Sequence, residues 1–162
     1  LCASRGLGDV YKRQVFMEAF DLHDVIANEI SYLSKQNKKR ISYKKKKVEI
    51  NANFDDISLA VKNLIKNALK YSPPEENILI QIEENDKSVR CSFQDFGSGI
   101  SESDQEKIFE RFYRVDKGRS RKVGGTGLGL AIVKHALDRN NAVIEIVSEL
   151  DHGSNFTIVF EK

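Results

Sequence analysis

Four polar side chains fall on one face of a predicted helix in the stretch "NLIKNALKYS": Asn63, Asn67, Lys70 and Tyr71. Their spacing of i, i+4, i+7 and i+8 aligns them at about 100° per residue, and the apolar residues between them point elsewhere. Asparagine is a poor helix former, so two of them within one helix call for a compensating role. Carboxamide oxygens can coordinate Mg²⁺, and an ammonium group can meet phosphate oxygens. On spacing alone, a plain solvated face explains the stripe equally well.

The turn "DFGSGI" at residues 95–100 follows a predicted strand. Gly97 and Gly99 let the backbone turn sharply and leave room for a flat ring. An ionised Asp95 only accepts hydrogen bonds, so it suits the exocyclic amine of adenine and repels the carbonyl oxygen of guanine. An ordinary turn is the alternative, because Asp-x-Gly is common in turns.

A glycine-rich segment leads directly into an apolar helix in "GGTGLGLAIVK", residues 124–134. Successive N–H groups in such a turn form a concavity for anions, and the start of a helix adds its positive dipole end. The alternative is a flexible linker, but a linker does not normally run into a helix that is apolar all round and must therefore be buried. G-x-x-x-x-G-K-[ST] is absent and G-x-G-x-x-G fails at Leu130, so the P-loop, the dinucleotide fingerprint and the protein-kinase glycine loop are disfavoured.

Between these two motifs lies "KIFERFYRVDKGRSRK", residues 107–122. Phe109 and Phe112 are spaced to dock a short helix. The aperiodic stretch that follows exceeds usual loop lengths, which favours a functional lid over a plain connection. A basic lid beside a phosphate site would shield and neutralise a triphosphate, although in isolation the charges could form a solvated surface. The basic residues are Arg111, Arg114, Lys117, Arg119, Arg121 and Lys122.

The composition indicates one domain with a core: 162 residues, 40% hydrophobic and 31% charged. The net charge of +2 is too near neutral to argue for nucleic acid. The run "KKRISYKKKK" at residues 38–47 has Tyr43 as its one aromatic, so we interpret it as a solvated hairpin. No apolar run is long enough to span a membrane, and we interpret Cys2 and Cys91 as reduced thiols of a cytosolic chain.

The predicted elements are mixed. Helices are expected over residues 20–39 with Asp21 as N-cap, over 54–72, over 128–139, and as a short piece within 101–112. Two short extended pieces around a lysine-rich turn are expected within residues 40–53. Strands are expected over 77–86 and 88–97 as an antiparallel pair, and over 142–149 and 154–161 as a closing pair. The fold class is α+β: a two-layer sandwich whose mixed, mostly antiparallel sheet is covered on one face by three helices.

The first fourteen residues, "LCASRGLGDVYKRQ", resemble a translated adapter tail. We expect residues 1–14 to be non-native and residues 15–162 to form the domain, with the natural protein extending upstream of Val15.

Taken in order, the motifs resemble the C-terminal ATP-binding domain of bacterial sensor histidine kinases, in the GHKL superfamily, which has the Bergerat-type fold. "NLIKNALKYS" is similar to the N box of that family, "DFGSGI" to its first glycine box, "KIFERFYRVD" to its F box and "GGTGLGLAIVK" to its second glycine box. "SELDHGSNFTIVF" resembles its last hairpin, and "FDLHDVIANEI" the segment that joins the dimerisation helices to this domain.

The resemblance implies the ligands ATP and Mg²⁺. Asn67 would hold the metal with Asn63 beside it, Lys70 and Tyr71 would contact phosphates and nucleotide, and Arg114 would reach the γ-phosphate. Asp95 would read adenine. The resemblance also assigns to nucleotide binding Gly97, Gly99 and Ile100 of the first glycine box and Gly125, Thr126, Gly127, Leu128 and Gly129 of the second.

The resemblance favours a kinase over an ATP hydrolase. Related hydrolases resemble one another in carrying glutamate where this chain has Asn63, and a neutral amide cannot take a proton from water. An imidazole nitrogen attacks with its own lone pair, so Asn63, Lys70 and Arg114 would serve catalysis by positioning and charge neutralisation. A degenerate nucleotide-binding regulatory module and a GHKL-type ATPase are the alternatives.

The phosphoacceptor box of the family is absent: His23, His135 and His152 lack its flanking pattern and are interpreted as ordinary histidines. The implied partners are therefore the protein's own dimerisation helices upstream and a response regulator. No nucleic-acid partner is expected. The domain is expected to be cytoplasmic, with any membrane contact made through other segments.

Overall fold

The computed structural model describes residues 15–115 and 127–162. The expected adapter-like tail at 1–14 lies outside this range, as do Lys117, Arg119, Arg121, Lys122, Gly125 and Thr126. The described elements follow the order β1 (Glu18–Asp21), α2 (Leu22–Ser31), α3 (Lys35–Arg40), β2 (Ile41–Tyr43), β3 (Glu49–Ala52), α4 (Phe54–Tyr71), β4 (Ile78–Glu84), β5 (Ser88–Asp95), α5 (Glu102–Gln105), α7 (Gly129–Asp138), β6 (Ala142–Glu149) and β7 (Gly153–Glu161).

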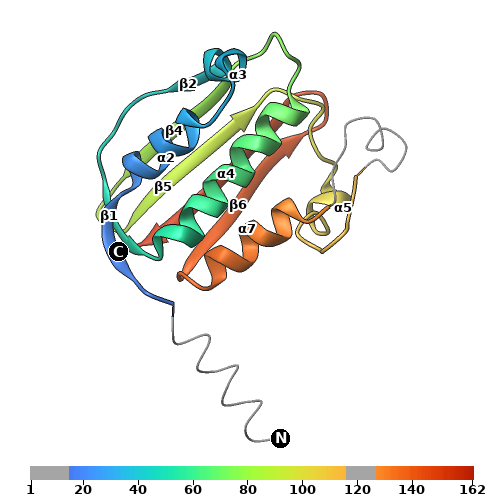
Figure 1. Cartoon of the computed structure of the whole chain (residues 1–162). Helices are drawn as coiled ribbons and strands as arrows, with labels where there is room; N and C mark the ends of the chain where they lie inside the picture. The colour runs from blue at the N-terminus through green and yellow to red at the C-terminus, as the bar shows by residue number, and fades with distance from the viewer. Residues whose placement is uncertain (1–14, 116–126) are drawn as a thin grey trace, which may run out of the picture.

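The main sheet has the strand order β2-β4-β5-β7-β6. β2 runs parallel to β4 and the other neighbours are antiparallel, while α2, α4 and α7 lie across one face (Figure 1). This confirms the predicted two-layer α+β sandwich. The pairing of β5 with β7 sets Asp95 directly opposite Ser154. It therefore brings the first glycine turn and the last hairpin to the same end of the sheet.

The longest helix, α4, begins where the sequence provides a cap and ends where it provides prolines. The side chain of Asn53 accepts a hydrogen bond of 3.0 Å from the backbone N–H of Asp56. Pro73 and Pro74 stop the helix two residues after Tyr71. One stripe of the helix is buried, made of Ile57, Ala60, Val61, Leu64, Ile65 and Ala68. The spacing of this stripe leaves the polar positions on the opposite side.

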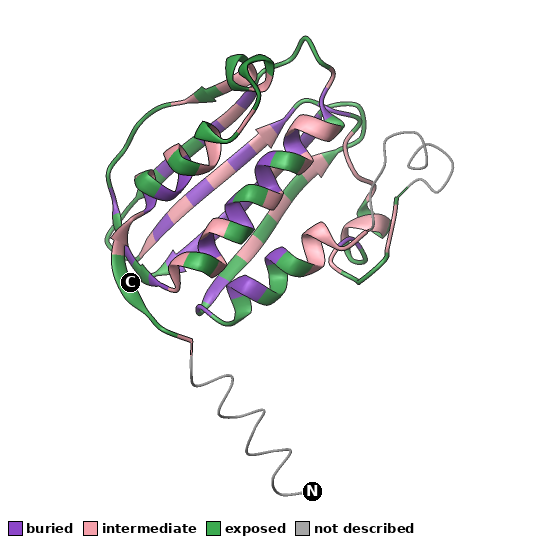
Figure 2. Ribbon diagram, in the orientation of Figure 1, coloured by how far each residue is buried: buried purple, intermediate pink, exposed green. Residues whose placement is uncertain are grey.

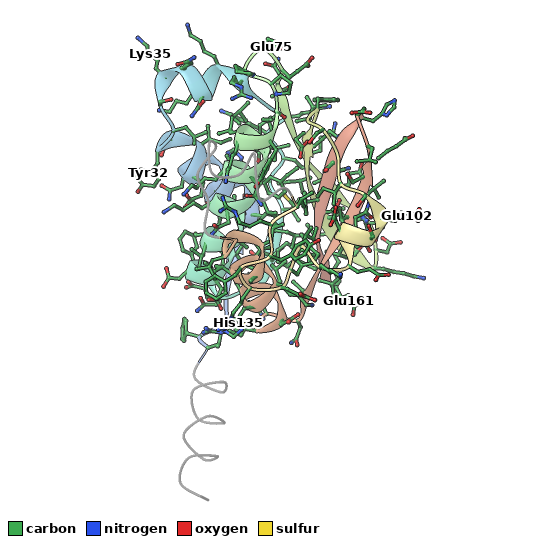
Figure 3. The ribbon with its side chains drawn as sticks, turned by 90° about the vertical axis from the view of Figure 1, so that its right-hand side faces the viewer. Tyr32, Lys35, Glu75, Glu102, His135 and Glu161 are labelled. Atoms are coloured by element: carbon green, nitrogen blue, oxygen red, sulfur yellow. The ribbon has the colours of Figure 1, made fainter. Side chains whose placement is uncertain are left out.

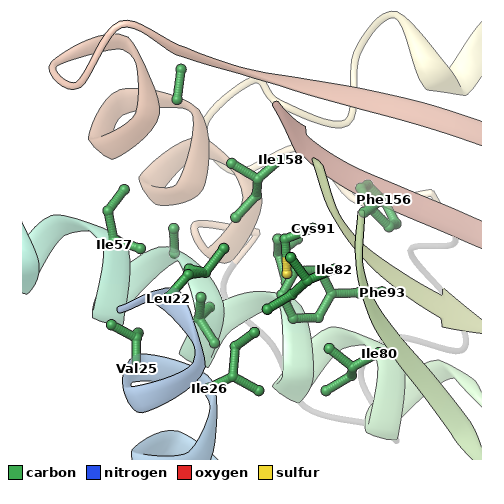
Figure 4. Close-up of a cluster of buried hydrophobic side chains, with 14 of the residues drawn as sticks. Leu22, Val25, Ile26, Ile57, Ile80, Ile82, Cys91, Phe93, Phe156 and Ile158 are labelled. Atoms are coloured by element: carbon green, nitrogen blue, oxygen red, sulfur yellow. The ribbon is translucent and has the colours of Figure 1, made fainter. Parts of the chain in front are cut away.

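The core fills the space between the helices and the inner face of the sheet. Figure 4 shows Leu22, Val25 and Ile26 of α2 pointing toward Phe93 and Ile158 of the central strands. Along β5, buried residues alternate with half-buried ones, as expected for a strand with only one face covered (Figure 2). Burial of this face stabilises the helix layer on the sheet.

Three sequence expectations need correction at the N-terminal side. The helix expected over 20–39 breaks after Ser31, and α3 begins anew with Ser34 as N-cap. The lysine-rich run is not a hairpin: β2 joins the main sheet beside β4, whereas β3 pairs with β1 in a separate two-stranded sheet. A hairpin would have needed β2 and β3 to pair with each other. The strand β1 was not predicted, and its last two residues fall at the start of the helix expected over 20–39.

The third long helix matches its expected range of 128–139 to within one residue. Its expected burial on all sides is wrong, however. Val133, Ala136 and Leu137 are buried against the core, but Ile132 is 36% exposed. α7 therefore covers the sheet with one face and presents another to the exterior.

Candidate functional site

One cavity of about 1060 Å³ opens beside α4 and the N-terminal end of α7. Its volume is slightly above the usual range of ligand pockets. Gly97 is not part of its wall, and Gly125 and Thr126 fall outside the described residues. The structure thus brings together most of the residues that the motifs singled out. Those in the wall are Asn63, Asn67, Lys70, Tyr71, Asp95, Gly99, Ile100, Arg114, Gly127, Leu128 and Gly129.

The two asparagines of α4 face the first turn of α7. A Cβ atom placed on Gly129 would lie 3.3 Å from Oδ1 of Asn63 and 3.9 Å from Oδ1 of Asn67. The side-chain Nδ2 of Asn63 donates to the carbonyl of Leu59 over 2.8 Å, which turns its oxygen toward α7. The two carboxamide oxygens therefore converge on one place, and glycine at 129 keeps that place open.

Within the part of the chain that the structure describes, no side chain caps the start of α7. Leu128 occupies the N-cap position and makes no side-chain hydrogen bond to the first amides of the helix. Helices normally satisfy these N–H groups with serine, threonine, aspartate or asparagine. Leu128, Gly129 and Leu130 line the cavity, so these amides lie where a ligand can meet them.

Asp95 is a buried carboxylate held by backbone amides. The N–H groups of Gly97 and Ser154 both donate to its Oδ1, over 3.0 and 3.2 Å. Burial raises the pKa of Asp95 above the ordinary carboxyl value, and the two backbone hydrogen bonds oppose that rise. Among the described residues both of its hydrogen bonds use Oδ1, so Oδ2 is the atom available to a ligand in the cavity.

The closeness of neighbouring backbone requires glycine at both positions of the turn. A Cβ on Gly97 would lie 2.2 Å from the carbonyl oxygen of Tyr71, and one on Gly99 would lie 2.0 Å from that of Glu149. Gly99 also has φ +72°, which confirms the sharp turn expected there. The turn is therefore wedged between the end of α4 and the end of β6.

Two cationic side chains, those of Lys70 and Arg114, lie in the cavity wall. The ammonium of Lys70 lies 5.2 Å from the centroid of the Tyr71 ring, a cation–π arrangement. Arg114, half-buried, follows Tyr113, whose hydroxyl donates to Asp104. This hydrogen bond and a second one from Ser101 lower the pKa of Asp104. The segment that carries Arg114 is thus tied to the start of α5.

Of the two phenylalanines expected to dock a short helix, one does so. Phe109 packs against the core, whereas Phe112 is 70% exposed with φ +66°. The helix α5 itself covers only Glu102–Gln105, with Ser101 as N-cap. The backbone N–H of Phe112 donates to the carbonyl of Gly127 over 2.9 Å, so these two segments meet although they are far apart in sequence.

Sequence reasoning missed the serines that hold the turn in place. Ser154 lines the cavity and Ser72 accepts a 3.1 Å hydrogen bond from the N–H of Phe96. Ser148 accepts from the N–H of Ile100 over 2.8 Å. Serine is common in loops and strand ends, so these positions carried no distinctive signal in the sequence.

The fold and this cavity define an ATPase-type domain. Residues 52–162 match the family described as histidine kinase-, DNA gyrase B- and HSP90-like ATPase, and the chain belongs to that family. Its matched region corresponds to the ATP-binding domain of sensor histidine kinases, which confirms the resemblance seen in the motifs.

Named relatives agree with this assignment. The chain is 46% identical over 99 residues to the sensor-like histidine kinase SenX3 of Mycolicibacterium smegmatis, covering 61% of this chain and 26% of SenX3. It is 42% identical over 113 residues to the phosphate regulon sensor protein PhoR of Pseudomonas aeruginosa, covering 70% of this chain and 26% of PhoR. The chain thus spans about a quarter of the length of these relatives.

Among solved structures, the catalytic domain of histidine kinase ThkA superposes with a TM-score of 0.76 at 25% identity. The match covers 91% of this chain and 98% of that one. Among the helices that the structure describes, none has both the length and the apolar character of a membrane span.

Proposed function

We propose that residues 15–162 bind Mg-ATP in this cavity and present its γ-phosphoryl group to a histidine of a helical dimerisation domain supplied separately. One observation carries the proposal. The buried Asp95, whose hydrogen bonds to other described residues use only Oδ1, and the converging oxygens of Asn63 and Asn67 lie in the wall of the same cavity. A response regulator would then receive the phosphoryl group from that histidine.

At the base end, Asp95 selects adenine by the hydrogen bond it accepts. Its Oδ1 is occupied by two backbone amides, so its orientation is set before the nucleotide arrives. Oδ2 then accepts from the exocyclic amine, and a guanine carbonyl at the same place would meet a negative charge. Gly99 and Ile100 line the cavity near this group, and Gly97 holds the turn from behind.

At the phosphate end, the residues present fit a divalent metal and a triphosphate. Asn67 would hold Mg²⁺ through its oxygen, with Asn63 beside it, and Gly129 leaves room there. The bound metal supplies neutralisation of charge on the phosphates. The first turn of α7 after Leu128, with Gly127 before it, offers N–H groups and a positive dipole end to phosphate oxygens. We assign phosphate contacts also to Gly125 and Thr126.

The charged residues of the wall position the transferred group. Lys70 and Tyr71 lie at the end of α4 and contact phosphates and nucleotide, and Arg114 reaches the γ-phosphate. Asn63 is an amide whose nitrogen already donates to Leu59, and it cannot accept a proton from water. The site therefore favours transfer to an imidazole nitrogen, which needs no base, over hydrolysis.

Two measurements test this function. Calorimetric titration should show ATP binding that strengthens with Mg²⁺, and GTP should bind far more weakly. With radiolabelled ATP, the chain alone should stay unlabelled, and addition of the dimerisation helices of a related sensor kinase should yield labelled histidine on those helices. Labelling of His23 in the chain alone, or steady ATP hydrolysis without an acceptor, would contradict the proposal.

A further inference from the structure

Arg40 differs from the other basic residues of its run. Lys38 and Lys39 are exposed, but Arg40 is half-buried and its guanidinium donates to four backbone carbonyls. These carbonyls belong to the last turn of α4 and to the loop that follows: Leu69 (3.3 Å), Ser72 (3.3 Å), Pro73 (3.0 Å) and Glu76 (3.3 Å). A planar fork with five N–H donors suits such a set of acceptors.

The register of the sheet brings Arg40 to this loop. β2 pairs in parallel with β4 so that Ile41 lies against Ile78. The residue before β2 therefore meets the connection that leads into β4. Figure 3 shows Lys35 of α3 and Glu75 of that connection at the same end of the molecule, in agreement with Figure 1.

Prolines at the end of α4 explain why a guanidinium is needed there. In a continuing helix, the carbonyl of Leu69 would accept from the amide of residue 73. Pro73 has no N–H, so this partner is missing, and Nη1 of Arg40 supplies a donor in its place. A cation at the C-terminal end of a helix also interacts favourably with the helix dipole.

The end of α4 that Arg40 holds also packs against the Asp95–Gly97 turn. Ser72 accepts the N–H of Phe96 through its hydroxyl, and the carbonyl of Tyr71 occupies the space beside Gly97. The N–H of Gly97 donates to Asp95. Displacement of residues 71–72 would therefore be transmitted directly to the carboxylate of Asp95.

We propose that Arg40 is a positioning residue of the nucleotide site, which fixes the end of α4 and thereby the place of the Asp95–Gly97 turn. Arg40 is absent from the cavity wall, so it acts through Tyr71 and Ser72 rather than by touching the ligand. This inference rests on the proposed nucleotide function for its consequence, but the positioning itself can be measured without any ligand.

The test compares Arg40→Met, Arg40→Lys and the matched control Lys39→Met, which removes a neighbouring exposed charge. The first readout is amide hydrogen exchange in the free protein. The amides of Phe96 and Gly97 report on the turn, and that of Asn53, which donates to Asn140, reports on the opposite end of α4. The second readout is ATP affinity by titration.

In Arg40→Met we expect exchange of Phe96 and Gly97 to accelerate roughly tenfold relative to Asn53, and ATP affinity to fall roughly tenfold. For Arg40→Lys, the exchange rates and the ATP affinity should lie between those of wild type and Arg40→Met, because one ammonium cannot donate to four carbonyls at once. Lys39→Met should change neither. If Arg40→Met does not fold, as judged by circular dichroism, the exchange pattern of Arg40→Lys decides.

Equal acceleration at all three amides, or no change at any of them, would show that Arg40 has no specific effect on the turn and would overturn the inference. If the wild-type protein binds ATP and Arg40→Met accelerates exchange only at Phe96 and Gly97 but binds ATP with unchanged affinity, Arg40 has no role in the nucleotide site. Failure of the wild-type protein to bind ATP would instead refute the proposed function, and the exchange pattern would still decide whether Arg40 positions the turn.

Discussion

The backbone N–H of Ser154 donates a 3.2 Å hydrogen bond to Oδ1 of Asp95, joining two residues 59 positions apart in the chain. The antiparallel pairing of β5 and β7 sets them opposite each other. The last hairpin thus orients the carboxylate that faces the cavity.

Replacement of Asp95 by asparagine should weaken ATP binding and stabilise the free protein. The amide oxygen can still accept from Gly97 and Ser154, but an NH₂ group would then face the adenine amine. We expect a loss in affinity of about a hundredfold, measured by titration. Asp86→Asn, in the exposed β4–β5 turn, is the control, and equal affinity in both variants would favour a module that does not read adenine through Asp95.

The stability change should depend on pH with a definite sign. The pKa of Asp95 is raised in the folded state, mainly by burial. Protonated Asp95 therefore contributes to the free energy of unfolding below the ordinary carboxyl pKa. This contribution is lost as pH rises through the raised pKa of the folded state. Denaturant unfolding at neutral pH should therefore show Asp95→Asn to be more stable than wild type, with the difference shrinking in acid. A less stable variant at neutral pH would contradict this assignment.

Substitution of Asn67 by alanine should remove the response to metal while leaving the base end intact. We expect affinity for Mg-ATP to fall roughly tenfold and affinity for metal-free ATP to change little. Titrations with and without Mg²⁺ measure the difference, and Asn51→Ala, exposed on β3, is the control. An equal loss under both conditions would assign Asn67 to the nucleotide rather than to the metal.

An alanine at position 129 should impair the phosphate end without unfolding the domain. Its Cβ would lie 3.3 Å from Oδ1 of Asn63, a tight contact that the amide must yield to. Alanine favours helix over glycine, so thermal stability should not fall. We expect roughly tenfold weaker Mg-ATP binding at an unchanged or higher melting temperature. Unchanged binding would show that the metal site lies elsewhere.

Alanine at position 97 should destabilise the whole domain. The added Cβ would lie 2.2 Å from the carbonyl oxygen of Tyr71, which belongs to the backbone and cannot rotate away. We expect a loss of about 1–3 kcal/mol in the free energy of unfolding, measured by denaturant titration. The neighbouring Ser98→Ala, at an exposed position, should change it by less than about 0.5 kcal/mol.

Removal of the Tyr113 hydroxyl should raise the pKa of Asp104 toward the ordinary carboxyl value. The hydrogen bond from Tyr113 is the largest cause of its lowered pKa, with that from Ser101 next. These hydrogen bonds to ionised Asp104 stabilise the folded state above the ordinary carboxyl pKa. Their contribution is lost as pH falls through the lowered pKa of Asp104. An NMR titration of Asp104 in Tyr113→Phe, with Tyr32→Phe as control, measures the shift. No shift in either variant would mean that the two side chains do not interact in solution.

Local patterns predicted most of the secondary structure. The stripe of apolar residues in α4, its end at Pro73 and the alternation in β5 each follow from a period or a breaker within a few residues. The same reasoning found the two short extended pieces that became β2 and β3 but gave them the wrong pairing. A partner distant in the chain, β4 or β1, decides which sheet a short strand joins. The reasoning also failed at Ile132, whose exposure depends on where α7 lies over the sheet.

The amino-acid order alone was sufficient for the chemical content of the site: two carboxamides one helical turn apart, a carboxylate before a glycine turn, and glycines before an apolar helix. Such groups are specified by local spacing, which a helix or a turn converts directly into a shared direction. Packing and strand register decide three other contacts: Gly129 lies close to Asn63, Ser154 donates to Asp95, and Arg40 donates to four carbonyls. These contacts join segments far apart in the chain, so they exist only once the helices and the sheet have come together.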